Sequence, residues 1–373
     1  MTAGAATTVV RAPGRVNLIG EHTDYNLGYV LPAAIDLEIR IAFVPTDDRR
    51  VELVSEATGE RAFFDLDAIG PNPRGMAGYV MGAAWALAEA GIPTRGFRGT
   101  LTSTLPRASG LSSSAALELA SAWALAPDPT ALDPLRLARI CQRAENAYVG
   151  VNCGLMDQFA SACGVAGAGM LLDCRSLAWR PVALPLATHT LVVVHTGSTR
   201  SLGTSQYNER RAQCEAAVAV LAADVPAIRS LRDVTAALLP AVQARVDEET
   251  YRRCRHVVTE NVRVEETVEA LAAGDLAAVG ALWAASHASL RDDYEVASPE
   301  LDALVEIAGS VPGVVATRMT GAGFGGCTIS LVERRAVDAL RDNILAEYPA
   351  RTGLTPRVYP VDAVAGAGFV AEG

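Results

Sequence analysis

The sequence predicts a protein that combines β-strands with α-helices, in a chain long enough for two domains. The first half alternates short strand-like segments of apolar and polar residues with alanine-rich helical runs. In the second half the composition shifts to long helical stretches with charges on regular faces, followed by short apolar strands. With 373 residues, half of them apolar, the chain can fill the cores of two domains of ordinary size.

The elements of the first half follow from local patterns. Pro13 and Gly14 are expected to break the chain near its start. The expected strands are 37–44, 51–54 and 62–64, in an antiparallel meander, and 97–103. The expected helices are 76–90, closed by Gly91, 115–125, which ends before Pro127, and one that Asp133 and Pro134 open and that runs to Tyr148.

The second half begins with a strand over residues 190–195, whose flanking residues His189 and His195 are interpreted as structural. Its expected helices are 206–223, 248–273, 275–290, 298–308 and 335–347. Its other expected strands are 314–319, 327–332 and 357–361.

Charge and cysteine content narrow the class of protein. The net charge is −10 and the arginines are scattered, so neither nucleic acid nor a membrane is an expected partner. No signal peptide and no apolar run of membrane-spanning length is apparent. The seven cysteines are an odd number and contain no C-x-x-C pair, which indicates reduced thiols in a cytoplasmic protein and no zinc site.

Residues 105–120, LPRASGLSSSAALELA, form a loop of small residues that leads into a helix. Such a loop offers free backbone N–H groups, hydroxyl donors and the positive end of a helix dipole. We therefore expect it to bind an anion, with phosphate as the first candidate. The alternative is an ordinary turn in which the serines compete for the helix N-cap.

The sequence contains no lysine. This absence excludes a Walker A loop, a protein-kinase active site and Schiff-base chemistry, each of which needs a lysine. Any nucleotide chemistry must therefore depend on backbone groups, arginine, hydroxyls and a metal ion.

Four adjacent polar residues follow Gly20: Glu21, His22, Thr23 and Asp24. Carboxylates and neighbouring donors suit a polyhydroxylated ligand, because each sugar hydroxyl both donates and accepts hydrogen bonds. A solvated loop is the simpler interpretation of the tetrad in isolation. A metal site is a third possibility, although the spacing lacks the H-E-x-x-H register.

Two further carboxylates are candidates. Asp157 lies in an apolar, small-residue stretch, where a carboxylate must find a partner or change its pKa. The alternative is a cap on a helix that begins near Gly154. Glu145 lies at the edge of the buried stripe of the preceding helix, where a lone glutamate is ordinarily solvated.

Gly321, Gly323 and Gly326 match the G-x-G-x-x-G dinucleotide pattern, but a β-rich run follows them instead of a helix. The glycines are therefore expected to form a tight strand-to-strand connection whose backbone approaches a ligand. A nicotinamide cofactor is rejected.

Several of these stretches together resemble the GHMP kinase superfamily: LPRASGLSSSA as its phosphate-binding loop, MTGAGFGG as its late glycine motif, and the strand-rich N-terminal segment. GRVNLIGEHTDYN is similar to the signature of the galactokinase family. NCGLMDQ, SQYNERRAQC and SHASLRDDYEVASPELDAL support this resemblance, which extends from about Arg11 to Gly326.

The resemblance implies a fold as well as an activity. The fold is α+β, with mixed and antiparallel sheets packed with helices in two domains, 1–185 and 186–373, and the active site in the cleft between them. It leaves open whether the tail after Thr355 packs back onto the first domain. The implied activity is transfer of the γ-phosphoryl group of ATP to the anomeric hydroxyl of α-D-galactose, in the Leloir pathway of galactose catabolism. The implied enzyme is a monomer or a weak homo-oligomer.

The resemblance also implies roles for individual residues. Asp157 takes the proton from the sugar O1, and Arg15 stabilises the transferring charge. Mg²⁺ is bound by Glu145 and by the hydroxyl of Ser114 or its neighbour Ser113. The implied sugar contacts are Glu21, His22, Thr23, Asp24, Gly154 and Tyr207. The implied ATP contacts are Ala108, Ser109, Gly110, Leu111, Ser112, Ser113 and Ser114.

The sequence departs from the family pattern at one place, and two other functions are alternatives to a galactose kinase. Relatives commonly carry glycines just before Gly110, where this chain has Arg107-Ala108-Ser109, so the path of the loop and the role of Arg107 stay open. Kinases of galactosamine, N-acetylgalactosamine and arabinose share much of the pattern, and the complete tetrad at 21–24 favours galactose. A catalytically silent sugar and nucleotide sensor is the other alternative, which the intact serine loop and Asp157 disfavour.

Overall fold

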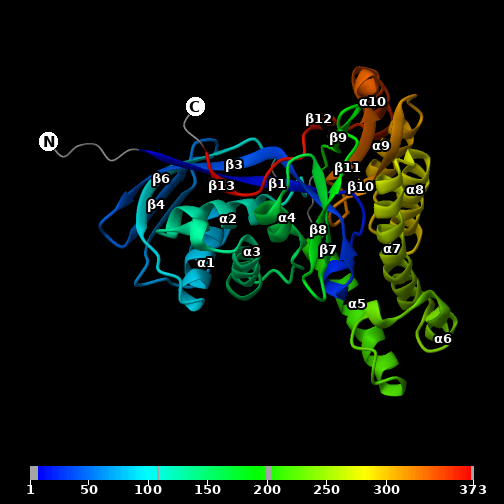
Figure 1. The fold of residues 1–373 in the computed structure, drawn as a ribbon, viewed down its shortest axis with the longest axis horizontal. Helices are drawn as coiled ribbons and strands as arrows, with labels where there is room; N and C mark the ends of the chain where they lie inside the picture. Colours follow the sequence, from blue (N-terminus) through cyan, green and yellow to red (C-terminus); the bar gives the residue numbers. More distant parts are fainter. Residues whose placement is uncertain (1–6, 107–108, 199–202, 371–373) are drawn as a thin grey trace.

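The computed structural model describes residues 7–106, 109–198 and 203–370. Figure 1 shows two halves, one with a large twisted sheet covered by helices on one side, the other with a smaller sheet flanked by longer helices. The expected α+β fold is confirmed, and most predicted strands and helices are present at the expected places.

The first sheet has the order β13-β1-β3-β6-β4-β5. Its neighbours pair antiparallel except β4 and β6, which are parallel. The strands are β1 (Thr8–Asn17), β3 (Pro32–Thr46), β4 (Arg50–Ser55), β5 (Arg61–Asp65), β6 (Gly96–Ser103) and β13 (Gly368–Phe369). The predicted meander is confirmed for β4 and β5, which pair antiparallel, but it is wrong for β3 and β4, because β6 lies between them. Alternation along a strand shows which face is buried, but it does not select the neighbour that binds each backbone edge.

The expected break at Pro13 and Gly14 is also wrong, since β1 runs through both residues. The pairing of β1 with β3 shifts register between Pro13 and Arg15, so the proline lies at a bulge, where its missing N–H is tolerated. A Cβ at Gly14 would overlap the Leu105 side chain and the Leu111 carbonyl oxygen. The bulge therefore lets the loop before α2 lie directly against the strand that carries Arg15.

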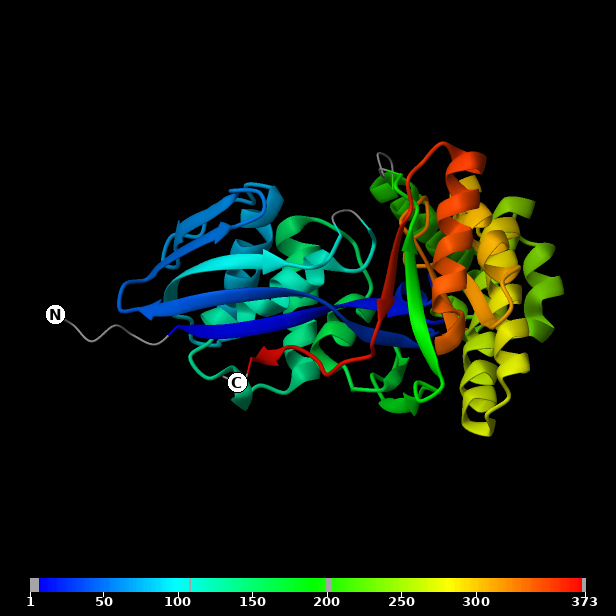
Figure 2. The same cartoon turned by 90° about the horizontal axis from the view of Figure 1, so that it is seen from above.

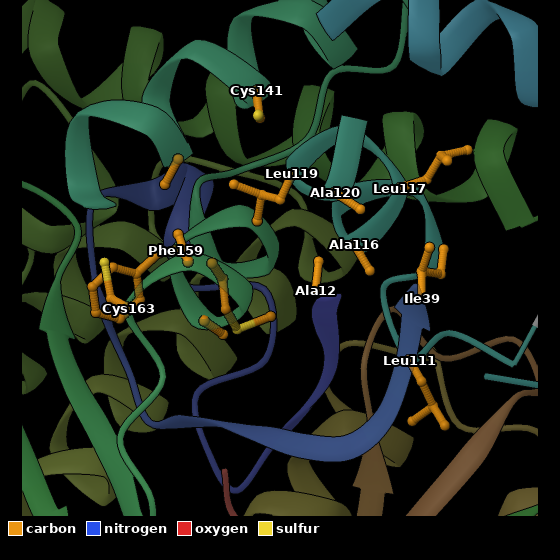
Figure 3. Close-up of a cluster of buried hydrophobic side chains, with 14 of the residues drawn as sticks. Ala12, Ile39, Leu111, Ala116, Leu117, Leu119, Ala120, Cys141, Phe159 and Cys163 are labelled. Atoms are coloured by element: carbon orange, nitrogen blue, oxygen red, sulfur yellow. The ribbon is translucent and has the colours of Figure 1, made fainter. Parts of the chain in front are cut away.

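Three helices, α1 (Gly75–Glu89), α2 (Ser113–Leu125) and α3 (Pro134–Arg143), lie on one side of this sheet, with α4 (Met156–Cys163) beside them (Figure 1). In Figure 3, Ala116 and Ala120 of α2 lie near Ala12 of β1, while Leu119 faces the region of Cys141 and Phe159. The small alanines let α2 approach the sheet closely, and the larger side chains fill the space between helices.

The helix predicted to continue to Tyr148 changes character at Ala144. Residues Ala144–Val149 form a π-helix that ends at Gly150. π-turns are common at functional sites because the wider turn re-aims the side chains that it carries. Here the wider turn places the Glu145 side chain in the interior, with 5% of the residue exposed.

The second sheet has the order β10-β11-β9-β12, antiparallel throughout. Its strands are β9 (His189–His195), β10 (Val314–Thr320), β11 (Cys327–Glu333) and β12 (Arg357–Val361). The helices of this half are α5 (Gly203–Asp224), α6 (Leu239–Gln243), α7 (Glu248–Ala273), α8 (Leu276–Asp292), α9 (Pro299–Gly309) and α10 (Val337–Thr352).

Strand β9 is buried on both faces. Leu191 and Val193 belong to the large core shared with the first half, whereas Val192 and Val194 pack with α9 and α10. A continuous apolar strand is the expected pattern for such a position, since successive side chains point to opposite faces.

A small third sheet, β2-β7-β8, lies between the halves and consists of β2 (Tyr29–Val30), β7 (Ala168–Asp173) and β8 (Trp179–Ala183). After residue 355 the chain first adds β12 to the second sheet and then crosses back, so that β13 pairs with β1. Figure 2 shows this return along the edge of the first sheet. The boundary near residue 185 stays a prediction.

No helix in the described part of the chain is both long enough and apolar enough to cross a membrane.

Candidate active site

A cavity of about 580 Å³ lies where the two halves meet. Its wall includes the serine loop and the glycine connection between β10 and β11, which are separated by about 200 residues of sequence. The predicted site residues that line it are Arg15, Glu21, His22, Asp24, Gly110, Ser112, Ser113, Ser114, Glu145, Gly154, Asp157 and Tyr207.

Asp157 and Arg15 form an ion pair at the centre of the cavity wall. The Arg15 Nε and Nη2 atoms lie 2.9 and 2.7 Å from Asp157 Oδ1. The Arg15 side chain is 5% exposed, whereas that of Asp157 is 27% exposed and faces the cavity. Asp157 lies in the first turn of α4, but Leu155 is the N-cap and no side chain caps the helix. The carboxylate is therefore held by arginine rather than used as a cap.

The serine loop opens α2 toward the cavity. Ser112 is the N-cap residue in a left-handed conformation, with φ of 62°, and no side chain caps the helix. Its hydroxyl is buried and has no hydrogen-bond partner among the described residues. Free N-terminal amides, an unpaired hydroxyl and the helix dipole together fit a phosphate group. The guanidinium of Arg15 also donates to the Gly110 carbonyl oxygen over 2.6 Å, which joins this loop to Asp157.

The Glu145 carboxylate and the Ser114 hydroxyl are oxygen ligands of the kind that bind a cation. The Glu145 carboxylate accepts a hydrogen bond from Gln158 Nε2 over 2.5 Å and lines the cavity together with Ser114. Burial, followed by the charge of Asp157, raises the pKa of Glu145, and the Ser114 hydroxyl acts to lower it. A carboxylate and a hydroxyl beside a phosphate site suit Mg²⁺, which keeps several waters and takes few protein ligands. The described residues contain no cluster of three or more His, Cys, Asp or Glu that could hold a metal ion.

Asp24, Gly154 and Tyr207 also line the cavity, and Asp24 lies against Gly154. A Cβ at Gly154 would overlap the Asp24 carboxylate, so a glycine is needed where the two segments touch. Burial and the neighbouring Asp157 raise the pKa of Asp24 to about 6. The Tyr207 ring packs 5.7 Å from the ring of His22, between centroids. These groups form a partly apolar, acceptor-rich wall that suits a sugar.

Three protein-family profiles match the chain. They are described as the galactokinase galactose-binding signature, over residues 2–45, the N-terminal domain of GHMP kinases, over 78–165, and their C-terminal domain, over 267–350. Curated galactokinases from Roseiflexus sp. and Chloroflexus aurantiacus are each 44% identical to it, over 98% and 97% of this chain and 93% of theirs. The chain belongs to the galactokinase family.

Solved structures agree with this membership of the galactokinase family. Lactococcus lactis galactokinase, crystallised with galactose, superposes with a TM-score of 0.92 at 38% identity, over 98% of this chain and 95% of that one. Methanococcus jannaschii mevalonate kinase, at 18% identity, shares the fold with a TM-score of 0.70, over 97% of this chain and all of that one.

Some residues predicted from the galactokinase resemblance do not reach the cavity wall. Thr23 is fully buried, and its hydroxyl donates to the carbonyl oxygens of Gly20 and Tyr29. The Ser109 hydroxyl donates to the Pro106 carbonyl oxygen, and Leu111 is fully buried, with its carbonyl oxygen accepting from Arg15 N. These three residues shape the loops that present other groups. Ala108 and its neighbour Arg107 lie outside the described residues.

Glu21 and His22 line the cavity, but their polar atoms are largely engaged within the protein. Glu21 Oε1 accepts from Gly321 N over 3.1 Å, and Oε2 pairs with Arg318. His22 Nε2 lies 3.2 Å from the Ala322 carbonyl oxygen. Because a carbonyl can only accept, Nε2 carries the proton and Nδ1 accepts from the Tyr25 hydroxyl, 2.9 Å away. Both residues therefore hold the glycine connection against the galactokinase signature segment.

Sequence reasoning missed Gln158, Glu118 and Cys153. Gln158 joins Glu145 to Glu118 of α2, and Cys153 donates from Sγ to Glu145 over 3.4 Å. A sequence signal existed for Glu118, which is an acidic residue inside the otherwise apolar stretch ALELASAWAL. Cys153 and Gln158 lie in the stretch NCGLMDQ, which supports the family resemblance but indicates no role for either side chain.

Two buried histidines are expected to lower the free energy of unfolding as pH decreases from about 6.5 to 3. Burial lowers the pKa of His22 to about 3 and that of His256 to about 4, while both rings protonate near 6.5 in the unfolded chain. Their contribution to stability is fully present above pH 6.5 and is lost toward the folded-state values, with His256 alone accounting for roughly 3 kcal/mol. Buried carboxyl groups whose pKa is raised (Glu21, Asp24, Glu118 and Glu145) act in the opposite direction, so the effect of His256 is measured as a difference from a variant that lacks its ring.

Urea unfolding at pH 7, 6, 5 and 4 measures this dependence. His256→Gln removes one titrating ring, so it is expected to reduce the slope between pH 6.5 and 4. The same dependence on pH in the wild type and in His256→Gln contradicts the prediction.

Proposed function

We propose that this chain transfers the γ-phosphoryl group of ATP to the anomeric hydroxyl of α-D-galactose, giving galactose 1-phosphate and ADP. The observation that carries the proposal is the Arg15–Asp157 pair, which lies between an open helix N-terminus and an acceptor-rich wall. A phosphate donor on one side and a hydroxyl acceptor on the other would meet at this pair.

The proposed roles of the two residues follow from their contacts. Asp157 is open to the cavity and accepts the proton of the sugar O1, while buried Arg15 fixes the carboxylate and stabilises charge on the transferring group. In a loose phosphoryl-transfer transition state the proton can leave late. Positioning and charge stabilisation then matter more than the strength of Asp157 as a base.

The nucleotide is proposed to bind through the amides at the start of α2, the hydroxyls of Ser112 and Ser113, and the helix dipole, without any lysine. Glu145 and Ser114 would hold Mg²⁺. When bound, the ion would neutralise charge on the phosphate oxygens and orient them.

The proposed sugar site uses Asp24, the backbone at Gly154 and Tyr207 as direct contacts, with Glu21 and His22 on the wall beside them. Asp24 and Gly154 touch, so their mutual packing would fix the acceptor that a galactose hydroxyl meets. A sugar with an acetamido group in place of a hydroxyl would leave polar groups that contact this hydroxyl unpaired, which a site of this kind rejects strongly.

We also infer that the enzyme works in the cytoplasm on two small molecules, without nucleic acid or membrane partners, as a monomer or a weak homo-oligomer. The seven cysteines, all within the described residues, form no disulfide, which supports a reducing compartment.

The test is ADP release across a panel of galactose, galactosamine, N-acetylgalactosamine and arabinose, with the phosphorylated carbon identified by NMR. Galactose is expected to give the highest kcat/KM, with phosphate on C1. A preference for N-acetylgalactosamine would overturn the substrate. Ligand-protected melting without any ADP release would instead indicate a sugar and nucleotide sensor.

A further inference from the structure

A fully buried glutamate lies behind the candidate cation site and has no part in the proposed chemistry. Glu118 is on α2, one helical turn after Ser114, so both side chains project from the same face of the helix. It does not line the cavity, and its Oε1 atom has no hydrogen-bond partner among the residues that the structure describes. A buried carboxyl group without a cationic partner is costly and calls for an explanation.

Among the described residues, the Glu118 side chain makes one hydrogen bond, and its donor, Gln158, also bonds to Glu145. Gln158 Nε2 donates to Glu118 Oε2 over 3.2 Å and to Glu145 Oε2 over 2.5 Å. An amide nitrogen has two hydrogens, so one amide group serves both carboxyl groups. Two acceptors on the nitrogen side also fix which way the amide faces, because its oxygen would be repelled there.

Gln158 follows Asp157 directly on α4, and Glu145 comes from the π-helix. The chain of contacts from Glu118 through Gln158 to Glu145 therefore connects α2, α4 and the π-helix behind the point where the phosphates and the sugar would meet. A partner that fixes a metal ligand from behind commonly contributes ten- to a hundredfold to metal affinity or activity.

We propose that Glu118 is a positioning residue for the cation site: by holding the Gln158 amide, it orients the Glu145 carboxylate toward the cation. This inference rests on the proposed function, because it takes Glu145 as a Mg²⁺ ligand. It requires only that Glu118 accept a hydrogen bond, which a carboxyl group does through its carbonyl oxygen whether or not it is ionised.

The test measures the affinity for Mn²⁺ at saturating ADP, by electron paramagnetic resonance, as well as the Mg²⁺ dependence of turnover. Glu118→Met keeps the approximate volume but removes the acceptor, and it is expected to weaken Mn²⁺ binding by about tenfold or more. Turnover should recover at high Mg²⁺, because the ligand itself remains. Glu118→Gln keeps an acceptor oxygen, so its Mn²⁺ affinity is expected within about threefold of the wild-type value.

Gln158→Leu removes the residue that connects Glu118 to Glu145, so it is expected to weaken Mn²⁺ binding as much as Glu118→Met does. If Glu118 acts through Gln158, the double variant should bind Mn²⁺ no more weakly than Gln158→Leu alone. Leu125→Ala, a buried change at the far end of the same helix, seven residues after Glu118, is the control for lost packing: it should lower Tm and leave Mn²⁺ affinity unchanged.

Additive losses in the double variant, or wild-type Mn²⁺ affinity in Glu118→Met, would overturn the proposal. Should Glu118→Met not fold, wild-type affinity in Gln158→Leu would overturn it equally. Glu145→Gln tests the proposed cation site separately from the role of Glu118. If this variant keeps wild-type Mn²⁺ affinity, the proposed cation site is wrong. If Glu145→Gln weakens Mn²⁺ binding but Gln158→Leu does not, only the role of Glu118 is rejected.

Discussion

Asp157→Asn is expected to lower kcat by a factor of about 10² to 10⁴, the range that a positioned proton acceptor contributes. The substitution keeps the shape of the side chain, so Arg15 stays in place through the remaining amide oxygen, but the group can no longer take the proton of the sugar O1. Galactose binding should persist, because the proposed sugar contacts lie on Asp24, Gly154 and Tyr207. Steady-state kinetics and calorimetric titration with galactose separate the two effects.

The matched control is Asp338→Asn, which makes the same chemical change at an aspartate whose side chain is 87% exposed on α10. It is expected to keep wild-type kcat. Near-normal turnover in Asp157→Asn would refute the assignment of Asp157, whereas loss of both turnover and galactose binding would indicate that the carboxylate is needed to form the sugar site.

Arg318→Met is expected to lower the free energy of unfolding by about 3–5 kcal/mol, the cost of breaking a buried ion pair from one side. Arg318 is fully buried on β10 and pairs with Glu21, which is 1% exposed. It also donates to the Leu18 carbonyl oxygen over 3.1 Å and to the Ser286 hydroxyl over 3.0 Å. The variant leaves a buried carboxylate without its cation at the place where the signature segment meets the second half.

Urea unfolding measures the loss, and Arg335→Met is the comparison, since the Arg335 side chain is 85% exposed in its pair with Glu333 and should contribute less than about 1 kcal/mol. Arg318→Met combined with Glu21→Gln should recover part of the loss, because no unpaired charge then remains buried. If Arg318→Met lowers the free energy of unfolding no more than Arg335→Met does, the buried Glu21 carboxylate is not stabilised by Arg318.

Sequence reasoning identified most of the residues that line the cavity, but not the hydrogen bonds and ion pairs that fix their side chains. The serine loop and Asp157 were identifiable from small residues before a helix and from a carboxylate in an apolar context, whereas Glu145 was singled out only by the family resemblance. Thr23 illustrates the limit: a hydroxyl in a polar tetrad is a reasonable sugar contact, but the turn of the backbone points it at two carbonyl oxygens instead.

The absence of lysine, the small-residue loop before a helix, and the carboxylates at fixed spacings are properties of the local chain, and they are enough to indicate the kind of chemistry. The insertion of β6, the pairing of Glu21 with Arg318 and the contact of Glu118 with Gln158 appear only in the folded chain. Each of them joins groups that lie far apart in the sequence. Local patterns set helices, turns and buried faces, whereas a buried polar group is satisfied by whichever group folding brings to it, as when the Asn17 backbone N–H donates to the Thr320 hydroxyl, 303 positions away.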